Sequence, residues 1–159
     1  MVKVHSTQMK IKFLTIILFF LSTTINYAES YIKASEGITW DKNNQTYSAQ
    51  GNVEFKNNEI KAYANKIFAL YSLEDDKEIF QKVNLDGSVI IHYQGEVFNA
   101  NSAIYDKVSN LITLFEKVTI ISPERYLSGD ELIVDLKNNT RTLKTIGKDS
   151  IAEALIKNE

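Results

Sequence analysis

The residues of this chain best suited to acid–base chemistry are three aspartates that recur at matching positions. Asp41, Asp106 and Asp135 each follow an apolar residue at the end of a predicted strand, directly before a turn. Two carboxylates that converge on a substrate can act as general acid and base. An aspartate at a strand end also bonds to the backbone of the turn that follows. A catalytic group is needed once, whereas these aspartates recur, so the sequence favours a structural role.

The other reactive residue types give no catalytic or metal site. His92 is the one histidine after residue 28, and it is predicted to lie on the solvent face of a strand. A single histidine without carboxylates at ligand spacing cannot form a two-histidine metal site. The chain has no cysteine, which excludes disulfides and thiolate chemistry. No glycine precedes a helical pattern, so a phosphate-binding loop is not expected. We therefore expect no enzyme activity, no metal and no cofactor.

The elements that hold these residues are repeated. Val53, Val89 and Val118 are each followed eleven positions later by a small residue and then a polar one. These pairs are Ala64-Asn65, Ala100-Asn101 and Gly129-Asp130. The repeat spacings of 36 and 29 residues are too short for domains and indicate stacked pairs of strands.

Between the repeats, the hydrophobic pattern is typical of β-strands. Tyr47, Ala49, Val53 and Phe55 alternate with polar residues, and β-branched and aromatic residues dominate. Turn signals are found at residues 42–45, 56–59, 93–96, 107–110, 122–125 and 137–140. The predicted fold class is all-β, with antiparallel stacked hairpins around one apolar interior. With no Pro/Ser-rich linker in the chain, we expect a single domain over residues 29–147.

Two segments interrupt the pattern. Residues 72–82 (SLEDDKEIFQK) are charged and lengthen one repeat, so we expect a long exposed loop there. Residues 148–159 are expected to form a C-terminal tail or a short helix, because Ser150 would cap a helix with apolar residues on one face.

The first 28 residues have the anatomy of a cleaved secretory signal peptide. Three lysines precede a short apolar run at residues 13–21, and Asn26-Tyr27-Ala28 offers a cleavage site. The alternative is an uncleaved membrane anchor, although the run is shorter than the ~20 apolar residues that a span needs. Removing the leader leaves 15 cationic and 20 acidic side chains, a net charge of −5 that disfavours nucleic-acid binding. We expect export to a bacterial periplasm.

The inward-facing positions form one long apolar row, which is either a packed core or a ligand-binding groove. Several members are alanine, which would leave room inside a stack of hairpins. The row consists of Val53, Phe55, Ile60, Ala62, Ile67, Ala69, Val89, Ile91, Phe98, Ala100, Leu114, Val118, Ile120, Leu127, Leu132 and Val134.

Three segments carry a resemblance to a known family. WDKNNQTYSAQGNVEFKNNEIKAYANKI, DGSVIIHYQGEVFNANSAIYDKVSNLITLFEKVTII and YLSGDELIVDLKNN are similar to the organic-solvent-tolerance-like (OstA-like) repeat. The resemblance covers about residues 35–147. Size, leader and single domain resemble the LptA-like periplasmic bridges of lipopolysaccharide transport. The third unit departs from the pattern, with Glu116-Lys117 where the others have Gly51-Asn52 and Gly87-Ser88.

The resemblance implies a β-jellyroll that is open along one side like a V. It implies that the interior row is a groove for the acyl chains of lipid A in lipopolysaccharide. It also implies head-to-tail stacking, both with other copies and with inner-membrane and outer-membrane proteins of the same fold, so that lipid crosses the periplasm for outer-membrane assembly.

Two other functions fit the same residues. The first is the membrane-anchored sister component of the same transport system, for which the leader would be retained. The second is an exported structural β-solenoid with a dry core and no ligand.

Overall fold

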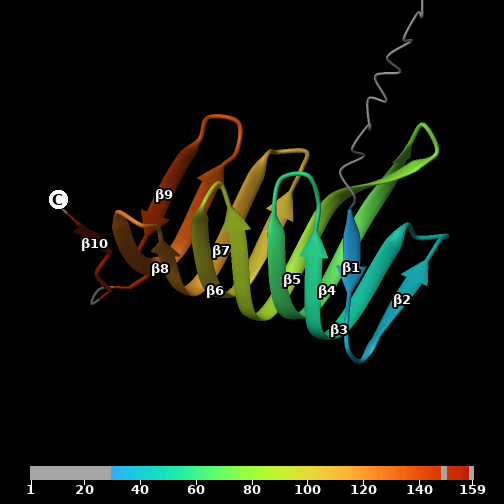
Figure 1. The fold of residues 1–159 in the computed structure, drawn as a ribbon, viewed down its shortest axis with the longest axis horizontal. Coiled ribbons are helices and arrows are strands. Elements are labelled where there is room, and N and C mark those ends of the chain that lie inside the picture. The colour runs from blue at the N-terminus through green and yellow to red at the C-terminus, as the bar shows by residue number, and fades with distance from the viewer. Residues whose placement is uncertain (1–29, 148–149, 158–159) are drawn as a thin grey trace, which may run out of the picture.

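The computed structural model describes residues 30–147 and 150–157, which form ten strands and leave the predicted signal peptide outside the described part (Figure 1). In chain order, the strands are β1 (Tyr31–Lys33), β2 (Gly37–Asp41), β3 (Thr46–Lys56), β4 (Lys61–Glu74), β5 (Lys77–Tyr93), β6 (Glu96–Asp106), β7 (Leu111–Ile121), β8 (Arg125–Asp135), β9 (Thr140–Lys144) and β10 (Glu153–Ile156). Among the described residues, no helix is long and apolar enough to cross a membrane.

All strands belong to one antiparallel sheet in the order β1-β3-β4-β5-β6-β7-β8-β10, with β2 paired to β3 and β9 paired to β8. The predicted all-β class of stacked hairpins is therefore confirmed. The long strands bend near their middle, so that the sheet folds over on itself into a V (Figure 1). In Figure 1, the bends run along the lower side and the hairpin turns along the upper side.

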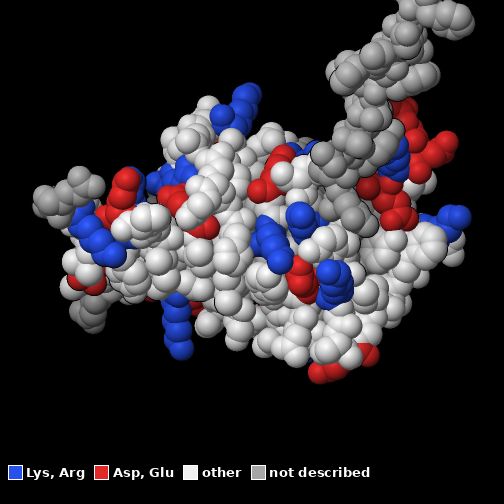
Figure 2. All heavy atoms as spheres, in the orientation of Figure 1, with Lys and Arg blue, Asp and Glu red and all other residues white. Residues whose placement is uncertain are grey.

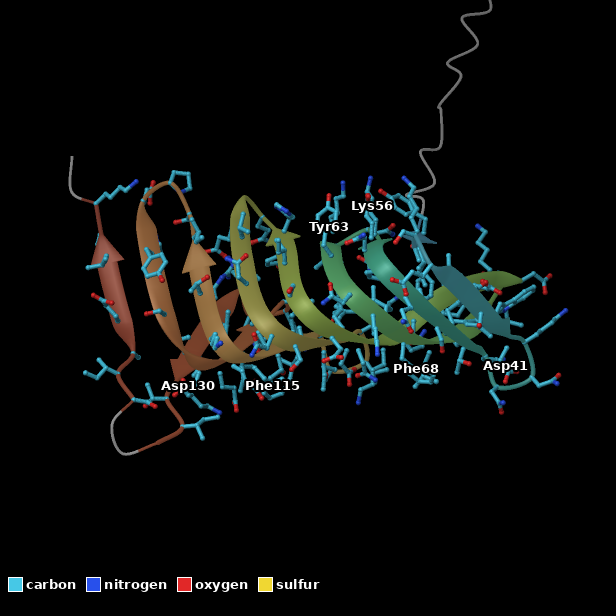
Figure 3. All side chains as sticks on the ribbon, turned by 90° about the horizontal axis from the view of Figure 1, so that it is seen from below. Asp41, Lys56, Tyr63, Phe68, Phe115 and Asp130 are labelled. Atoms are coloured by element: carbon cyan, nitrogen blue, oxygen red, sulfur yellow. The ribbon has the colours of Figure 1, made fainter. Side chains whose placement is uncertain are left out.

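The bend divides the sheet into two walls. The first wall contains residues 31–33, 53–56, 61–64, 89–93, 96–100, 118–121, 125–129 and 153–156. The second wall contains residues 37–41, 46–50, 66–74, 77–86, 102–106, 111–115, 131–135 and 140–144. We call the line of bends the corner and the opposite side, where the turns of both walls meet, the mouth. Figure 3 looks onto the fold from below, with Lys56 and Tyr63 on one side and Phe68 and Phe115 on the other.

The repeated sequence motif forms the corner. The first residue of each corner pair is Gly51, Gly87 or Glu116, and both members of each pair have positive φ angles. The ladder register shifts at each pair, because two residues of one strand face a single residue of the next. The facing residues are Asn65, Asn101 and Asp130.

The Glu116-Lys117 pair adopts the same left-handed conformation as the glycine-containing pairs, with φ angles of 62° and 54°. The Nδ2 atom of Asn101 donates a hydrogen bond to Glu116 Oε2 at 3.0 Å. The departure of the third unit from the family pattern thus leaves the backbone of the corner unchanged.

One sequence expectation is wrong. Residues 72–82 are not a loop: they extend β4 and β5 into a hairpin that projects beyond its neighbours, where Figure 2 shows acidic side chains gathered. The alternation was hidden because the ladder shifts between Leu70 and Tyr71, leaving Gln81 as an extra residue in β5. For the C-terminal segment, the sequence left open a tail or a short helix. Residues 153–156 form β10 instead, because pairing with residues 125–128 of β8 satisfies their backbone.

The three recurrent aspartates cap turns, as predicted. Asp41 Oδ1 accepts hydrogen bonds from the backbone N–H groups of Asn43 and Asn44 at 3.0 and 3.1 Å. Asp106 accepts one from the N–H of Ser109, and Asp135 accepts those of Lys137 and Asn138. Each aspartate therefore fixes the turn that joins two strands of the second wall.

Candidate functional site

The structure brings the predicted row of inward residues together in one apolar cluster between the two walls. Leu127 is partly buried, and every other member is buried. Phe55, Ile91 and Phe98 have no exposed surface. Apart from the hydroxyl-bearing Tyr71, Tyr93 and Tyr105, every buried side chain among the described residues is fully apolar, so the interior is largely apolar along its length.

Away from the β1–β2 end, the interior is closed to water in this structure. Side chains of the first wall, such as Val53, and of the second wall, such as Ala69, both have zero exposure. The alanines of the row therefore do not leave a water-accessible channel at these positions. A lipid chain would enter this space only if the two walls moved apart.

Sequence reasoning missed a set of buried residues that belong to the same cluster, most of them on the second wall. Phe80, Val83 and Leu85 were overlooked because the loop expected at residues 72–82 interrupted the alternation from which inward positions are predicted. Tyr71, Tyr93 and Tyr105 are absent from the predicted row, although alternation alone places them inward. The missed members are Ala49, Ala64, Tyr71, Phe80, Val83, Leu85, Tyr93, Ala103, Tyr105 and Ile112.

The apolar interior reaches solvent at the β1–β2 end of the sheet. Ile38 and Trp40 lie in β2 and are 47% and 52% exposed, although they pair with the inward residues Ala49 and Tyr47. A cavity of about 180 Å³ lies at this end, lined by Ser30, Tyr31, Ile32, Ile38, Tyr47, Glu78 and Phe80. The end of the interior is thus an uncovered apolar surface.

An aromatic cluster lines the β1–β2 end of the interior. The rings of Trp40 and Tyr47 stack with centroids 6.0 Å apart, and Trp40 Nε1 donates a hydrogen bond to the Tyr71 hydroxyl at 2.9 Å. The Tyr47 hydroxyl donates to Glu78 Oε2 at 2.7 Å. Burial, together with the adjacent Glu78 carboxylate, raises the pKa of Tyr47 above its usual range. The tyrosine hydroxyl therefore stays protonated and directed toward the rim.

A second depression lies outside the apolar interior. It has a volume of about 580 Å³ and lies beside the corner on the outer face of the second wall. Gln50, Lys66 and Asp86 are among its lining residues. The lining is mixed, because it also includes Phe68 and Ile67, a member of the interior row.

The remaining reactive residue types do not converge. His92 is exposed, as predicted, and its ring makes an edge contact with Tyr63 at a centroid distance of 5.9 Å. Within residues 30–147 and 150–157, no group of three or more His, Cys, Asp or Glu side chains is arranged to hold a metal ion.

The sheet exposes backbone edges at both ends. β1 and β2 cover the two halves of β3, and β9 and β10 cover the two halves of β8. In the described sheet, these four short strands have no partner on their outer side. Unpaired strand edges are sites where another strand can add.

Comparison with known proteins decides the family. Residues 31–140 match the family described as LptA/(LptD N-terminal domain) LPS transport protein. The chain belongs to this family. The predicted OstA-like, LptA-like resemblance is therefore confirmed, and the coarse role is lipopolysaccharide transport.

The fold of a solved family member agrees. The structure is similar to that of LptH from Pseudomonas aeruginosa, the LptA-homologous periplasmic component of the conserved lipopolysaccharide transport device. The TM-score is 0.68 over 82% of this chain and 96% of that chain, at 11% sequence identity. At this identity the likeness concerns the fold, and it confirms the predicted open jellyroll. No curated protein sequence matches the chain.

Proposed function

We propose that this protein binds lipopolysaccharide by placing the acyl chains of lipid A between its two walls, and that it passes this lipid across the periplasm. The observation that carries the proposal is the long apolar interior, in which tyrosines are the only buried side chains with a polar group among the described residues. The ligand contacts are those of the interior row, with Phe55 and Ile91 on either side of Ala62 in the first wall.

The chemistry of the ligand fits this interior. Each CH₂ group that leaves water for an apolar environment contributes about 0.8 kcal/mol. Several acyl chains therefore supply enough free energy to replace the side-chain contacts that are lost when the walls part. The sugars and phosphates would remain in water at the mouth, where the rim residues are polar.

The two exposed sheet ends support a bridging role. A strand of one molecule that adds to β1–β2 and a strand of another that adds to β9–β10 would make a head-to-tail contact that does not close. Like-folded proteins of the inner and outer membranes would occupy the ends of such a row. The apolar end at Ile38 and Trp40 would then be covered by the interior of the next molecule.

The transport role requires neither catalysis nor a cofactor from this chain. A ligand-free structural module is the second candidate, because the interior is closed to water in this structure. The retained-leader alternative concerns residues outside the described part of the chain.

The test is the binding of purified protein to fluorescent lipopolysaccharide. We expect competition by unlabelled lipopolysaccharide and by lipid A, and no competition by deacylated lipopolysaccharide, because the acyl chains supply the affinity. The absence of binding by correctly folded protein, or equal competition by the deacylated form, would contradict the proposal and favour the structural module.

A further inference from the structure

Two polar contacts join the walls across the mouth. The Tyr105 hydroxyl, on the second wall, donates a hydrogen bond to Oε2 of Glu59, in the β3–β4 turn of the first wall, at 2.7 Å. Arg141, in β9 of the second wall, donates from Nε to Glu96 Oε2, in β6 of the first wall, at 2.8 Å. We call these contacts the mouth ties.

The second tie is partly sheltered from water, whereas in the first tie the tyrosine is buried and Glu59 is exposed. The Tyr105 side chain is almost completely buried, and the Arg141 and Glu96 side chains are 20% and 16% exposed. The Arg141 guanidinium also lies over the Tyr93 ring, 5.6 Å from its centroid. Partly buried, charge-assisted hydrogen bonds of this kind are stronger than exposed ion pairs.

We call the turns that border the mouth on each wall its rims. Hollows lie along the rims beside and between the two ties. A cavity of about 70 Å³ lies beside the first tie, lined in part by Asn57, Phe80 and Lys107. A depression of about 400 Å³ between the two ties is lined in part by Tyr93 and Leu136. The mouth therefore has hollows on its surface, with polar contacts between them.

We infer that the Glu59–Tyr105 and Glu96–Arg141 contacts act as a latch that holds the mouth shut in the absence of lipid, and that lipid enters sideways through the mouth after they break. The walls would turn about the corner, where the left-handed residue pairs interrupt the ladders. This inference rests on the proposed function, because it concerns access to the same interior.

The latch has a specific consequence for entry. Apolar contacts between the walls, such as the edge contact of Phe55 with Phe80 at 5.2 Å, are replaced when acyl chains enter. The mouth ties have no such replacement in an acyl chain. They therefore oppose opening at the start of entry and favour closure after the lipid leaves.

The chain offers matched control contacts. Tyr31 donates to Glu54 Oε1 at 2.6 Å, and Lys144 contacts Glu131 Oε1 at 3.0 Å. Each control has the chemistry of a mouth tie, a tyrosine–glutamate hydrogen bond or a cation–glutamate pair, but lies within one wall. The variant Tyr105→Phe/Glu96→Gln is therefore compared with Tyr31→Phe/Glu131→Gln.

The experiment measures the distance between the rims without lipid. Because the chain has no cysteine, spin labels can be placed at Asn58→Cys and Val108→Cys on opposite rims, with Ser48→Cys and Asn84→Cys within the second wall as a reference. We expect about a thirtyfold rise in the open population of the Tyr105→Phe/Glu96→Gln variant, because the two lost bonds together remove about 2 kcal/mol. The control variant and the reference pair should be unchanged.

Unchanged rim distances in a folded tie variant would overturn the latch. An equal widening in the Tyr31→Phe/Glu131→Gln control would also overturn it, because general loosening would then be the cause. The uptake of fluorescent lipopolysaccharide by the same proteins separates the two claims. A longer distance between the rims together with faster uptake supports the latch. A longer distance without uptake in any variant supports the polar contacts as a latch on the mouth but contradicts the proposed lipid function.

Discussion

At the residue scale, the reactive side chains serve the fold. The three aspartates, whose carboxylates could in principle act in acid–base catalysis, accept hydrogen bonds from backbone N–H groups of their own turns. Hydrogen bonds from the Asn44 side chain and backbone hold the pKa of Asp41 below its usual value. Backbone hydrogen bonds from Ser109 and Asn138 lower the pKa of Asp106 and Asp135 in the same way. The repetition of aspartate in this chain therefore marks turns.

These lowered pKa values predict how stability depends on pH. The folded-state pKa values lie below the unfolded value of about 3.9, so the ionised carboxylates stabilise the fold above that pH. This stabilisation is lost as the pH falls through the folded-state pKa values. We expect the urea midpoint of the wild type to fall between pH 5 and pH 2.5.

The Asp41→Asn/Asp106→Asn/Asp135→Asn variant should lose less stability over the same range, because its amide groups do not titrate. Asp75→Asn, at the tip of the β4–β5 hairpin, serves as a control outside these turns. Urea unfolding followed by circular dichroism gives the midpoints. An equal pH-dependent loss in the wild type and the triple variant would show that other groups control the acid response.

At the element scale, the strands and turns were predictable because they depend on local patterns. Alternation identified the inward side chains of β3, β7 and β8, and the turn residues marked the hairpins. The β4–β5 extension was not predictable in this way, because the ladder shift at Gln81 reverses the alternation. β10 was missed because its four residues form a strand only by pairing with β8, which lies 25 or more residues earlier.

The corner shows a second limit of the local pattern. The valine–alanine–asparagine spacing indicated a repeat, but the reason for the repeat is a contact between neighbouring strands. An added Cβ at Gly87 would lie 2.6 Å from Asn65 Nδ2, so a larger residue there would displace the Asn65 side chain. The position of the predicted groove followed from alternation, whereas its closure depends on how the two walls meet, which alternation does not describe.

The unpaired edge strands lead to a prediction about self-association. A head-to-tail contact uses different edges on the two partners, so proline at either edge should weaken self-association by removing a backbone donor. We expect Thr39→Pro in β2 and Thr142→Pro in β9 each to be more monomeric than the wild type. An equimolar mixture should recover a dimer, because each variant retains the edge that the other lacks.

Thr39→Ala and Thr142→Ala, which keep the backbone N–H, are the matched controls. Light scattering after size exclusion gives the masses, and circular dichroism checks the fold. A mixture that stays monomeric, or a dimer formed by each variant alone, would contradict a head-to-tail contact through these edges.

At the scale of the whole molecule, one folded sheet combines three properties that lipid transport needs. Its interior is apolar from end to end, its ends are open to neighbours, and its mouth is joined by a few polar contacts. The family places the chain in lipopolysaccharide transport, and in the function proposed above the acyl chains bind between the two walls. The closed interior means that binding and opening are coupled.

The most direct test of the central claim places a photo-crosslinking amino acid at single sites in living Gram-negative cells. Phe55 and Ile91 face the interior, and the neighbouring Glu54 and His92 face outward as controls. We predict lipopolysaccharide adducts at Phe55 and Ile91 and none at Glu54 and His92. Folded and exported protein that forms no adduct at any of the four sites, or equal adducts at all four, would contradict acyl-chain binding between the walls.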